Sequence, residues 1–177
     1  MNEISINPSK MIVVVTITII VTSTCILIPY SIITNEDIKS ITNSWNIYSL
    51  ITGLLIFILG IVVHELIHGI FIAIFSKNGF KDVHFGISTN EIIAPYCEFR
   101  EDLNIWKFRI CAIMPTIILG FTPIILGFII HDFIYLLGGC LFIIAGAGDF
   151  YLLWITKSLK KETLIKGCSN KDKLYYE

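Results

Sequence analysis

Charged residues are scarce in this 177-residue chain. They make up 15% of it, against about a quarter of an ordinary soluble domain, whereas hydrophobic residues make up 55% and the mean hydropathy is +0.78. This composition excludes an ordinary soluble domain and indicates an integral membrane protein surrounded by a lipid bilayer. The net charge is −1, and the chain lacks both a long basic block and interleaved basic and aromatic residues, which argues against nucleic-acid binding.

Paired cysteine motifs are missing as well. The five cysteines contain no CxxC pair, and several of them fall inside apolar runs. Neither a disulfide framework nor a cysteine zinc knuckle is indicated, so we interpret the cysteines as small buried hydrophobic residues. They are Cys25, Cys97, Cys111, Cys140 and Cys168.

Long apolar runs are what the sequence does contain. A helix needs about 20 predominantly apolar residues to cross a bilayer, and four runs are long enough: residues 11–33, 47–75, 108–130 and 133–155. No small-residue cleavage pattern follows the first run, so we expect a retained anchor helix and not a cleaved signal peptide. The third run contains Pro115 and Pro123, and we expect it to be kinked or broken.

These runs predict an all-α integral membrane protein with four transmembrane helices and a small cytoplasmic β-hairpin between the second and third. The hairpin is indicated by alternation over residues 81–88, a turn-like segment at 89–91 and an apolar piece at 92–94. We divide the chain into an N-terminal anchor helix with an external loop (residues 1–46), a membrane core (47–156) and a solvated, Lys-rich cytoplasmic tail (157–177).

The basic residues predict the orientation of the chain. With four spans, twelve of the thirteen lysines and arginines fall on the side that holds both termini and the loop after residue 75, and only Lys39 falls on the other side. Because short loops rich in Lys and Arg stay in the cytoplasm, we expect a multi-pass cell-membrane protein with both termini cytoplasmic. The second and fourth spans then run parallel, from outside to inside.

The second run carries the motif His64-Glu65-Leu66-Ile67-His68. On a helix the two histidines lie about 40° apart and one turn along the axis, so both rings can reach one ion. This HExxH arrangement is typical of a Zn²⁺ site in which the glutamate acts as general base on the zinc-bound water. The alternative is a network of buried, hydrogen-bonded histidines. Each charged group in the hydrocarbon costs about 2.5–3.5 kcal/mol on insertion scales. A bound metal would offset the combined cost of the three ionisable side chains of the motif.

Two histidines leave a zinc ion short of a third protein ligand. The loop residues His84 and Glu98 are candidates, and His131 lies at the far end of the membrane. Asp149 is the better candidate because it is the only carboxylate well inside another span.

The depth of Asp149 supports this choice. It lies six residues before the end of the fourth run, and His68 lies seven before the end of the second, so the two should meet toward the cytoplasmic side. The small residues 146–148 allow the two helix backbones to approach closely. The alternative is a helix-end carboxylate paired with the tail lysines or with a histidine.

Several motifs together resemble a known family. The HExxH helix, the loop stretch Pro95-Tyr96-Cys97, a span around Met114-Pro115 and the late Gly148-Asp149 are similar to the putative zincin peptidases, small multi-span membrane proteins grouped with a domain-of-unknown-function family. The resemblance covers roughly residues 50–155. More distantly, the layout resembles that of site-2 proteases, whose intramembrane zinc is held by two histidines on one helix and an aspartate on a later one.

The resemblance implies His64, His68 and Asp149 as zinc ligands and Glu65 as base. The chain also departs from site-2 proteases, which have a glycine after the aspartate and usually a nearby asparagine that polarises the carbonyl. Here Phe150 follows the aspartate, and no asparagine lies between residues 106 and 169. The group that stabilises the oxyanion is therefore unassigned.

We conclude that the sequence predicts a membrane-embedded zinc metalloendopeptidase that cleaves a peptide or membrane-protein substrate near the cytoplasmic side. The hairpin would either bind an extended substrate along its edge or cap the site. Two alternatives stay open: a non-catalytic metal-binding membrane protein, such as a sensor, chaperone or transport component, and a degenerate protease that holds substrates without cleaving them. Replacing Glu65 with Gln distinguishes these functions.

Overall fold

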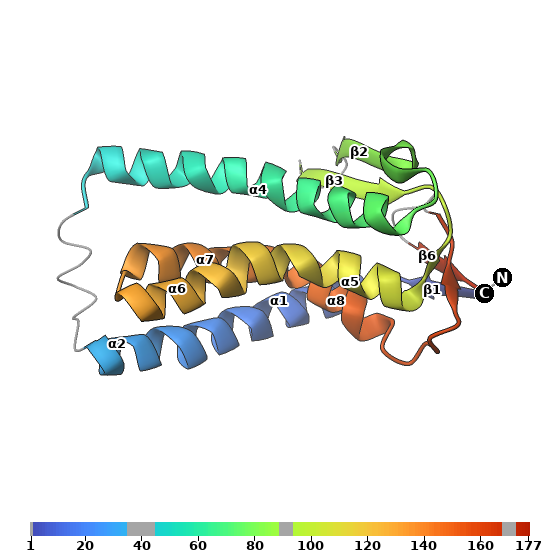
Figure 1. The fold of residues 1–177 in the computed structure, drawn as a ribbon. Helices are drawn as coiled ribbons and strands as arrows, with labels where there is room; N and C mark the ends of the chain where they lie inside the picture. Colours follow the sequence, from blue (N-terminus) through green and yellow to red (C-terminus); the bar gives the residue numbers. More distant parts are fainter. Residues whose placement is uncertain (1, 35–44, 89–93, 168–172) are drawn as a thin grey trace.

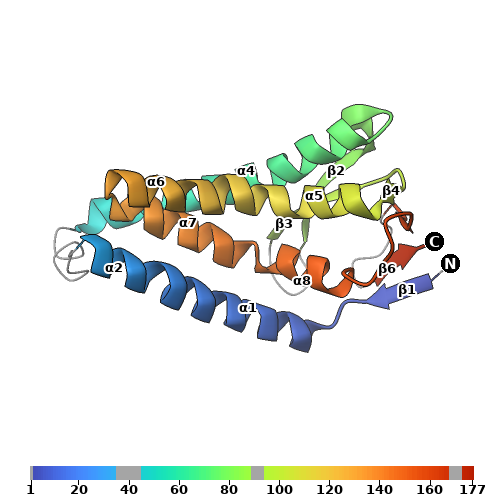
Figure 2. The same cartoon turned by 60° about the horizontal axis from the view of Figure 1, so that its bottom comes forward.

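Long apolar helices make up most of the fold, with two small sheets at one end (Figures 1 and 2). The computed structural model describes residues 2–34, 45–88, 94–167 and 173–177. Its helical elements are α1 (Pro8–Thr22), η1 (Ser23–Leu27), α2 (Ile28–Thr34), α4 (Ile47–Phe75), η2 (Gly79–Asp82), α5 (Ile105–Pro115), η3 (Thr116–Phe121), α6 (Thr122–Ile130), α7 (Phe133–Ala145) and α8 (Ala147–Ile155). Its strands are β1 (Asn2–Ser5), β2 (Val83–Ser88), β3 (Ala94–Phe99), β4 (Leu103–Asn104), β5 (Leu164–Ile165) and β6 (Lys173–Tyr176).

Three of the predicted spans are continuous helices, Pro8–Thr34, Ile47–Phe75 and Ile105–Ile130. The fourth is the pair α7 and α8, whose axes differ by 44°. The described part of the chain thus has three helices long and apolar enough to cross a membrane, or four if the bent pair is one span.

The third span, predicted to be kinked or broken at its prolines, is distorted there but not broken. The chain stays helical from α5 to α6 and takes a π-helical form over η3, directly after Pro115. A wide π-helical turn accommodates the missing backbone donor without ending the helix. The sharp bend lies instead in the fourth span at Gly146, where α7 ends and α8 begins.

The third and fourth spans pack closely as an antiparallel helical hairpin. They are joined at His131, which takes the left-handed conformation (φ 54°) and ends α6. A Cβ atom placed on Gly139 would lie only 2.5 Å from the carbonyl oxygen of Gly120. The two backbones can therefore approach this closely only because residue 139 is a glycine.

Strands β2 and β3 form the predicted hairpin between the second and third spans. They pair antiparallel, with His84 opposite Glu98 and Phe85 opposite Cys97. The predicted turn at residues 89–91 lies outside the described residues, as does most of the predicted second piece; the observed second strand begins at Ala94. Among the described residues β3 pairs with no strand other than β2.

A second sheet, which the sequence analysis missed, joins the two ends of the chain. Its strand order is β1-β6-β5-β4, and we call it the terminal sheet (Figure 2). Asn2 is opposite Tyr176, and Leu103 is opposite Ile165. The sheet packs its buried Leu103, Ile165 and Leu174 against Phe108 of α5. Two segments of the tail, β5 and β6, are therefore part of a folded sheet, which its lysines did not predict.

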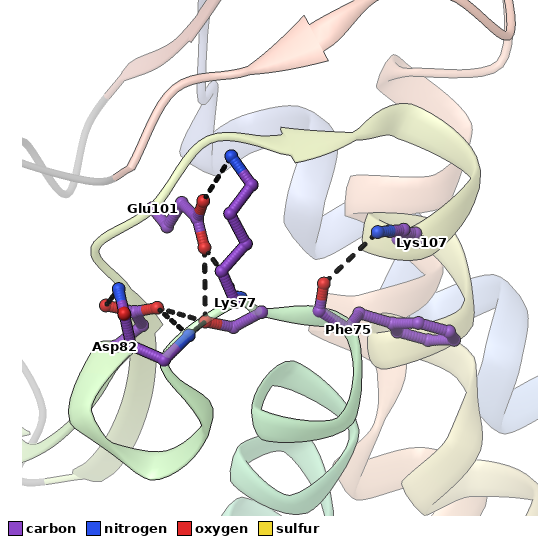
Figure 3. A network of polar contacts seen from close by, with 7 residues as sticks. Phe75, Lys77, Asp82, Glu101 and Lys107 are labelled. Atoms are coloured by element: carbon purple, nitrogen blue, oxygen red, sulfur yellow. Dashed lines mark hydrogen bonds and ion pairs between the residues drawn. The ribbon is translucent and has the colours of Figure 1, made fainter.

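A network of polar contacts ties the end of α4 to the base of the hairpin (Figure 3). The Ser76 hydroxyl, just past α4, donates to Asp82, which precedes β2. The Lys77 backbone N–H donates to Glu101, which follows β3, at 2.8 Å. The Lys107 ammonium donates to the carbonyl of Phe75 at 3.1 Å. These bonds hold β3 in place beside α4.

We expect this hairpin to loosen in acid. The Ser76 hydroxyl lowers the pKa of Asp82 below 3.8, and the Lys77 N–H lowers the pKa of Glu101 below 4.5. A lowered pKa in the folded state stabilises the fold above the unfolded value, and that stabilisation disappears as the pH falls through the folded value. Amide hydrogen exchange of residues 76–101, corrected for its intrinsic rate, should therefore speed up below about pH 4.

The double variant Asp82→Asn, Glu101→Gln serves as the control. It lacks both carboxylates, so its hairpin should exchange faster than the wild type at pH 7 and change little further in acid. Equal protection in both proteins at neutral pH would contradict a stabilising role for the network.

Candidate metal centre

Two histidines on α4 face the interior of the bundle. His64 is 7% exposed, and it begins the part of α4 that is buried; the preceding half of the helix, up to Gly60, is almost entirely exposed. The His64 and His68 rings lie 4.9 Å apart between centroids. One ligand atom each of His64, Glu65 and His68 lies within 4.8 Å of the other two, so these three residues could hold a metal ion.

The structure brings Asp149 to the same place, as the depth argument predicted. Its Oδ2 lies 3.1 Å from His64 Nε2, and its Oδ1 lies 3.4 Å from His68 Nε2. The aspartate sits in the first turn of α8, and its N–H donates to the carbonyl of Gly146. The bend at Gly146 thus directs the short carboxylate at both rings. We call His64, Glu65, His68 and Asp149 the candidate centre.

A backbone carbonyl on α5 orients His68. The Nδ1 atom of His68 lies 2.7 Å from the carbonyl oxygen of Cys111. Pro115 stands four residues after Cys111 and has no N–H, so this carbonyl lacks its normal helical donor. The proline in the third span therefore frees an acceptor for His68. The sequence contained this signal in Met114-Pro115, but only the fold shows which carbonyl it exposes.

The hydrogen bond to Cys111 places a proton on Nδ1 of His68, because a carbonyl oxygen can only accept. Nε2, which lies 3.4 Å from Asp149 Oδ1, is then the ring nitrogen that can bind a metal ion when the ring is neutral. Two imidazoles with one carboxylate are a donor set used by catalytic zinc. The residues present therefore fit a zinc ion.

Two cavities meet at the candidate centre. The larger has a volume of about 490 Å³ and extends from Glu65, His68 and Asp149 past β3 to the terminal sheet. The smaller, of about 300 Å³, is lined by His64, Glu65 and Asp149 and by apolar residues that include Phe142. Glu65 and Asp149 line both cavities, so the candidate centre is accessible from two sides.

Strand β3 forms one wall of the larger cavity. Pro95 to Phe99 all line it, and the backbone N–H of Cys97 lies beside the Glu65 carboxylate. Burial raises the pKa of the Cys97 thiol to about 12, so this thiol is protonated at neutral pH in the metal-free protein. Cys111 and Cys140 are buried, as interpreted from the sequence, whereas Cys97 is half-buried and Cys25 is exposed.

The other third-ligand candidates lie elsewhere. His84 and Glu98 are opposite each other on the hairpin, where His84 is exposed and Glu98 lines the larger cavity. His131 lies at the turn between α6 and α7, at the opposite end of the bundle from the hairpin (Figure 1). Of the candidates named from the sequence, Asp149 is the one that contacts both histidines of the motif.

A family model agrees with this geometry. The model for the family described as putative zincin peptidase matches residues 57–164, which is more than half of the chain. The chain belongs to this family. Comparisons with curated proteins and with solved structures found no match.

Membership of the putative zincin peptidases indicates a metallopeptidase. The matched range includes α4 from residue 57 onward, the hairpin, the third span and both parts of the fourth, and it therefore contains all four residues of the candidate centre. The family also implies zinc as the metal, which agrees with the donor set of two imidazoles and a carboxylate.

Proposed function

We propose that this protein is a membrane-embedded zinc metallopeptidase that hydrolyses peptide bonds near the cytoplasmic side of the membrane. His64, His68 and Asp149 hold the zinc, and Glu65 is the general base. The observation that supports this most directly is the convergence of both histidine Nε2 atoms on the carboxylate of Asp149, with His68 fixed from behind by the Cys111 carbonyl.

Glu65 is placed to move protons during hydrolysis. When bound, zinc lowers the pKa of a coordinated water and polarises the scissile carbonyl. The Glu65 carboxylate lines both cavities, and its ligand atom lies within 4.8 Å of those of the two histidines. It accepts the proton that the attacking water loses and returns it to the leaving amine nitrogen. This cycle returns Glu65 to its starting state.

The cavities favour an extended segment that passes through the site. The cleft continues on both sides of Glu65 and Asp149, so the scissile bond can lie within a chain and not only at its end. A helical substrate hides its carbonyls and must unwind. Strand β3 lines the larger cavity with Cys97 level with Glu65, and an extended segment bound there would run along this strand. We therefore propose an endopeptidase whose hairpin binds substrate by strand addition.

Aromatic residues indicate the depth of the candidate centre. Trp106 is 43% exposed beside Phe75 at the end of α4, and the Lys107 ammonium lies 5.8 Å from both ring centroids. Exposed Trp with adjacent Lys is typical of the membrane interface. His68 precedes Phe75 by seven residues, or about 10 Å of helix. The centre would thus lie about two turns below the cytoplasmic surface.

Zinc content tests the proposal. We expect about one zinc per chain in the detergent-purified wild type after zinc is supplied and excess metal removed. His84→Ala removes an exposed histidine that could bind zinc adventitiously, and it should retain the same content. A wild type that holds no zinc would mean that His64, Glu65 and His68 form a hydrogen-bonded network, and the peptidase proposal would be wrong.

A further inference from the structure

The hydroxyl of Thr116 is buried without a partner. Thr116 is the first residue of η3, directly after Pro115, and its side chain is fully buried at 0% exposure. Its Oγ1 atom makes no hydrogen bond within the described part of the chain. A buried hydroxyl that makes no hydrogen bond is destabilising, so this group calls for an explanation beyond packing.

Six other helical threonines in the described part of the chain avoid that cost. Their hydroxyls donate to a carbonyl four or five residues earlier in their own helix, which is the usual arrangement. They are Thr16, Thr18, Thr24, Thr34, Thr122 and Thr156. Thr116 instead turns its hydroxyl away from its own helix and toward α7.

The hydroxyl points to the bend that carries Asp149. A Cβ atom placed on Gly146 would lie 2.5 Å from Thr116 Oγ1 and 3.5 Å from Asp149 Oδ2. The two oxygens therefore border the same small space beside Gly146, which exists because glycine has no side chain. Thr116 lines neither cavity, so it does not touch a substrate bound there.

We propose that Thr116 is a positioning residue that donates a hydrogen bond to the carboxylate of Asp149 when the metal is bound, either directly or through one water. This inference rests on the proposed function, in which Asp149 is a zinc ligand. In the structure the two carboxylate oxygens face His64 and His68. Once one oxygen binds the metal, the other still has lone pairs that need a donor, and Thr116 is the buried donor beside it.

The physical basis is the support that metal ligands require. Ligating carboxylates are normally hydrogen-bonded, and losing such a partner typically costs 10- to 100-fold in metal affinity. Thr116 would supply this bond from the third span, just as the Cys111 carbonyl supports His68 from the same helix. One helix would then orient ligands that stand on two others.

Threonine and valine have the same shape, so Thr116→Val tests the hydroxyl alone. We expect the variant to bind zinc 10- to 100-fold more weakly than the wild type, measured by competition with a chelator in detergent. Thr116→Ser keeps the hydroxyl and should restore most of the affinity. The zinc-free thermal midpoint of Thr116→Val should be equal to or above that of the wild type, because an unpartnered hydroxyl is lost.

Thr156→Val is the matched control. Thr156 is also 0% exposed, but its hydroxyl donates within its own helix to Leu152 at 2.8 Å. This variant should lower the zinc-free thermal midpoint and leave zinc affinity unchanged, which is the opposite of the result expected for Thr116→Val.

Three outcomes would overturn the inference. If the wild type binds zinc through Asp149 and Thr116→Val binds it equally well, Thr116 plays no part and the proposed function stands. If Thr116→Val lowers the zinc-free midpoint as Thr156→Val does, its role is structural. If the wild type binds no zinc, the inference and the proposed function fail together.

Discussion

Glu65→Gln is expected to abolish peptidase activity and to leave zinc bound. Glutamine keeps the shape of the side chain but cannot accept the proton of the attacking water, and loss of a general base costs about 10²–10⁴-fold in rate. The zinc should remain because His64, His68 and Asp149 are unchanged and surround the site from α4 and α8. The loss of activity would be measured by comparing the new protein termini in membranes from cells that express the wild type with those from cells that express the variant in equal amounts.

The control for this experiment is Glu162→Gln, which removes an exposed glutamate of the tail. The termini produced by the wild type should appear with this control and disappear with Glu65→Gln. An identical set of termini in all three samples would show that the chain does not cleave proteins through Glu65. If zinc were nevertheless bound at one per chain, the protein would be a metal-binding membrane protein or a degenerate protease.

Asp149→Ala is expected to weaken zinc binding by more than about 100-fold, because it removes a ligand itself and not a supporting partner. Only the two imidazoles would remain, and the site would lose its one negative ligand. Asp149→Asn should behave similarly, since the amide matches the carboxylate in shape but carries no charge. Zinc affinity measured by chelator competition at pH 7 would provide the comparison.

Asp102→Ala is the control variant for the measurement of zinc affinity. Asp102 pairs with Lys166 at 2.9 Å on the surface, away from the candidate centre, and its loss should leave zinc affinity unchanged. Wild-type affinity in Asp149→Ala would exclude the aspartate as third ligand and direct attention to Glu65 itself as a ligand.

Features carried by a single helix could be predicted from the sequence. The period of the α-helix places His64, Glu65 and His68 together, and run length defines the helical segments. Asp149 could be chosen because two parallel helices with similar distances to the same surface meet at one depth. The contacts of Asp149 with both histidine rings agree with this reasoning.

Features that depend on pairing between distant residues could not be predicted. The terminal sheet pairs Asn2 with Tyr176, and neither two-residue strand β4 nor β5 has a sequence pattern of its own. The lysines of the tail suggested a solvated end. In the structure Lys166 forms an ion pair with Asp102, and Lys173 forms one with Glu3. The third run was predicted to be kinked or broken at its prolines; it takes a π-helical form directly after Pro115 and stays helical. The sharp bend at Gly146 was not predicted, because it depends on the close approach of Thr116, which only the fold shows.

The terminal sheet also determines when the larger cavity can form during synthesis of the chain. β6 supplies Lys173 and Leu174 to the wall of the larger cavity, and it pairs with β1 at the opposite end of the chain. A nascent chain emerges from its N-terminus, and contacts between the first and last residues form only after synthesis has reached the last of them. The apolar helices can therefore be synthesised while the larger cavity still lacks the wall that Lys173 and Leu174 form. That wall is added only after β6 has left the ribosome and paired with β1.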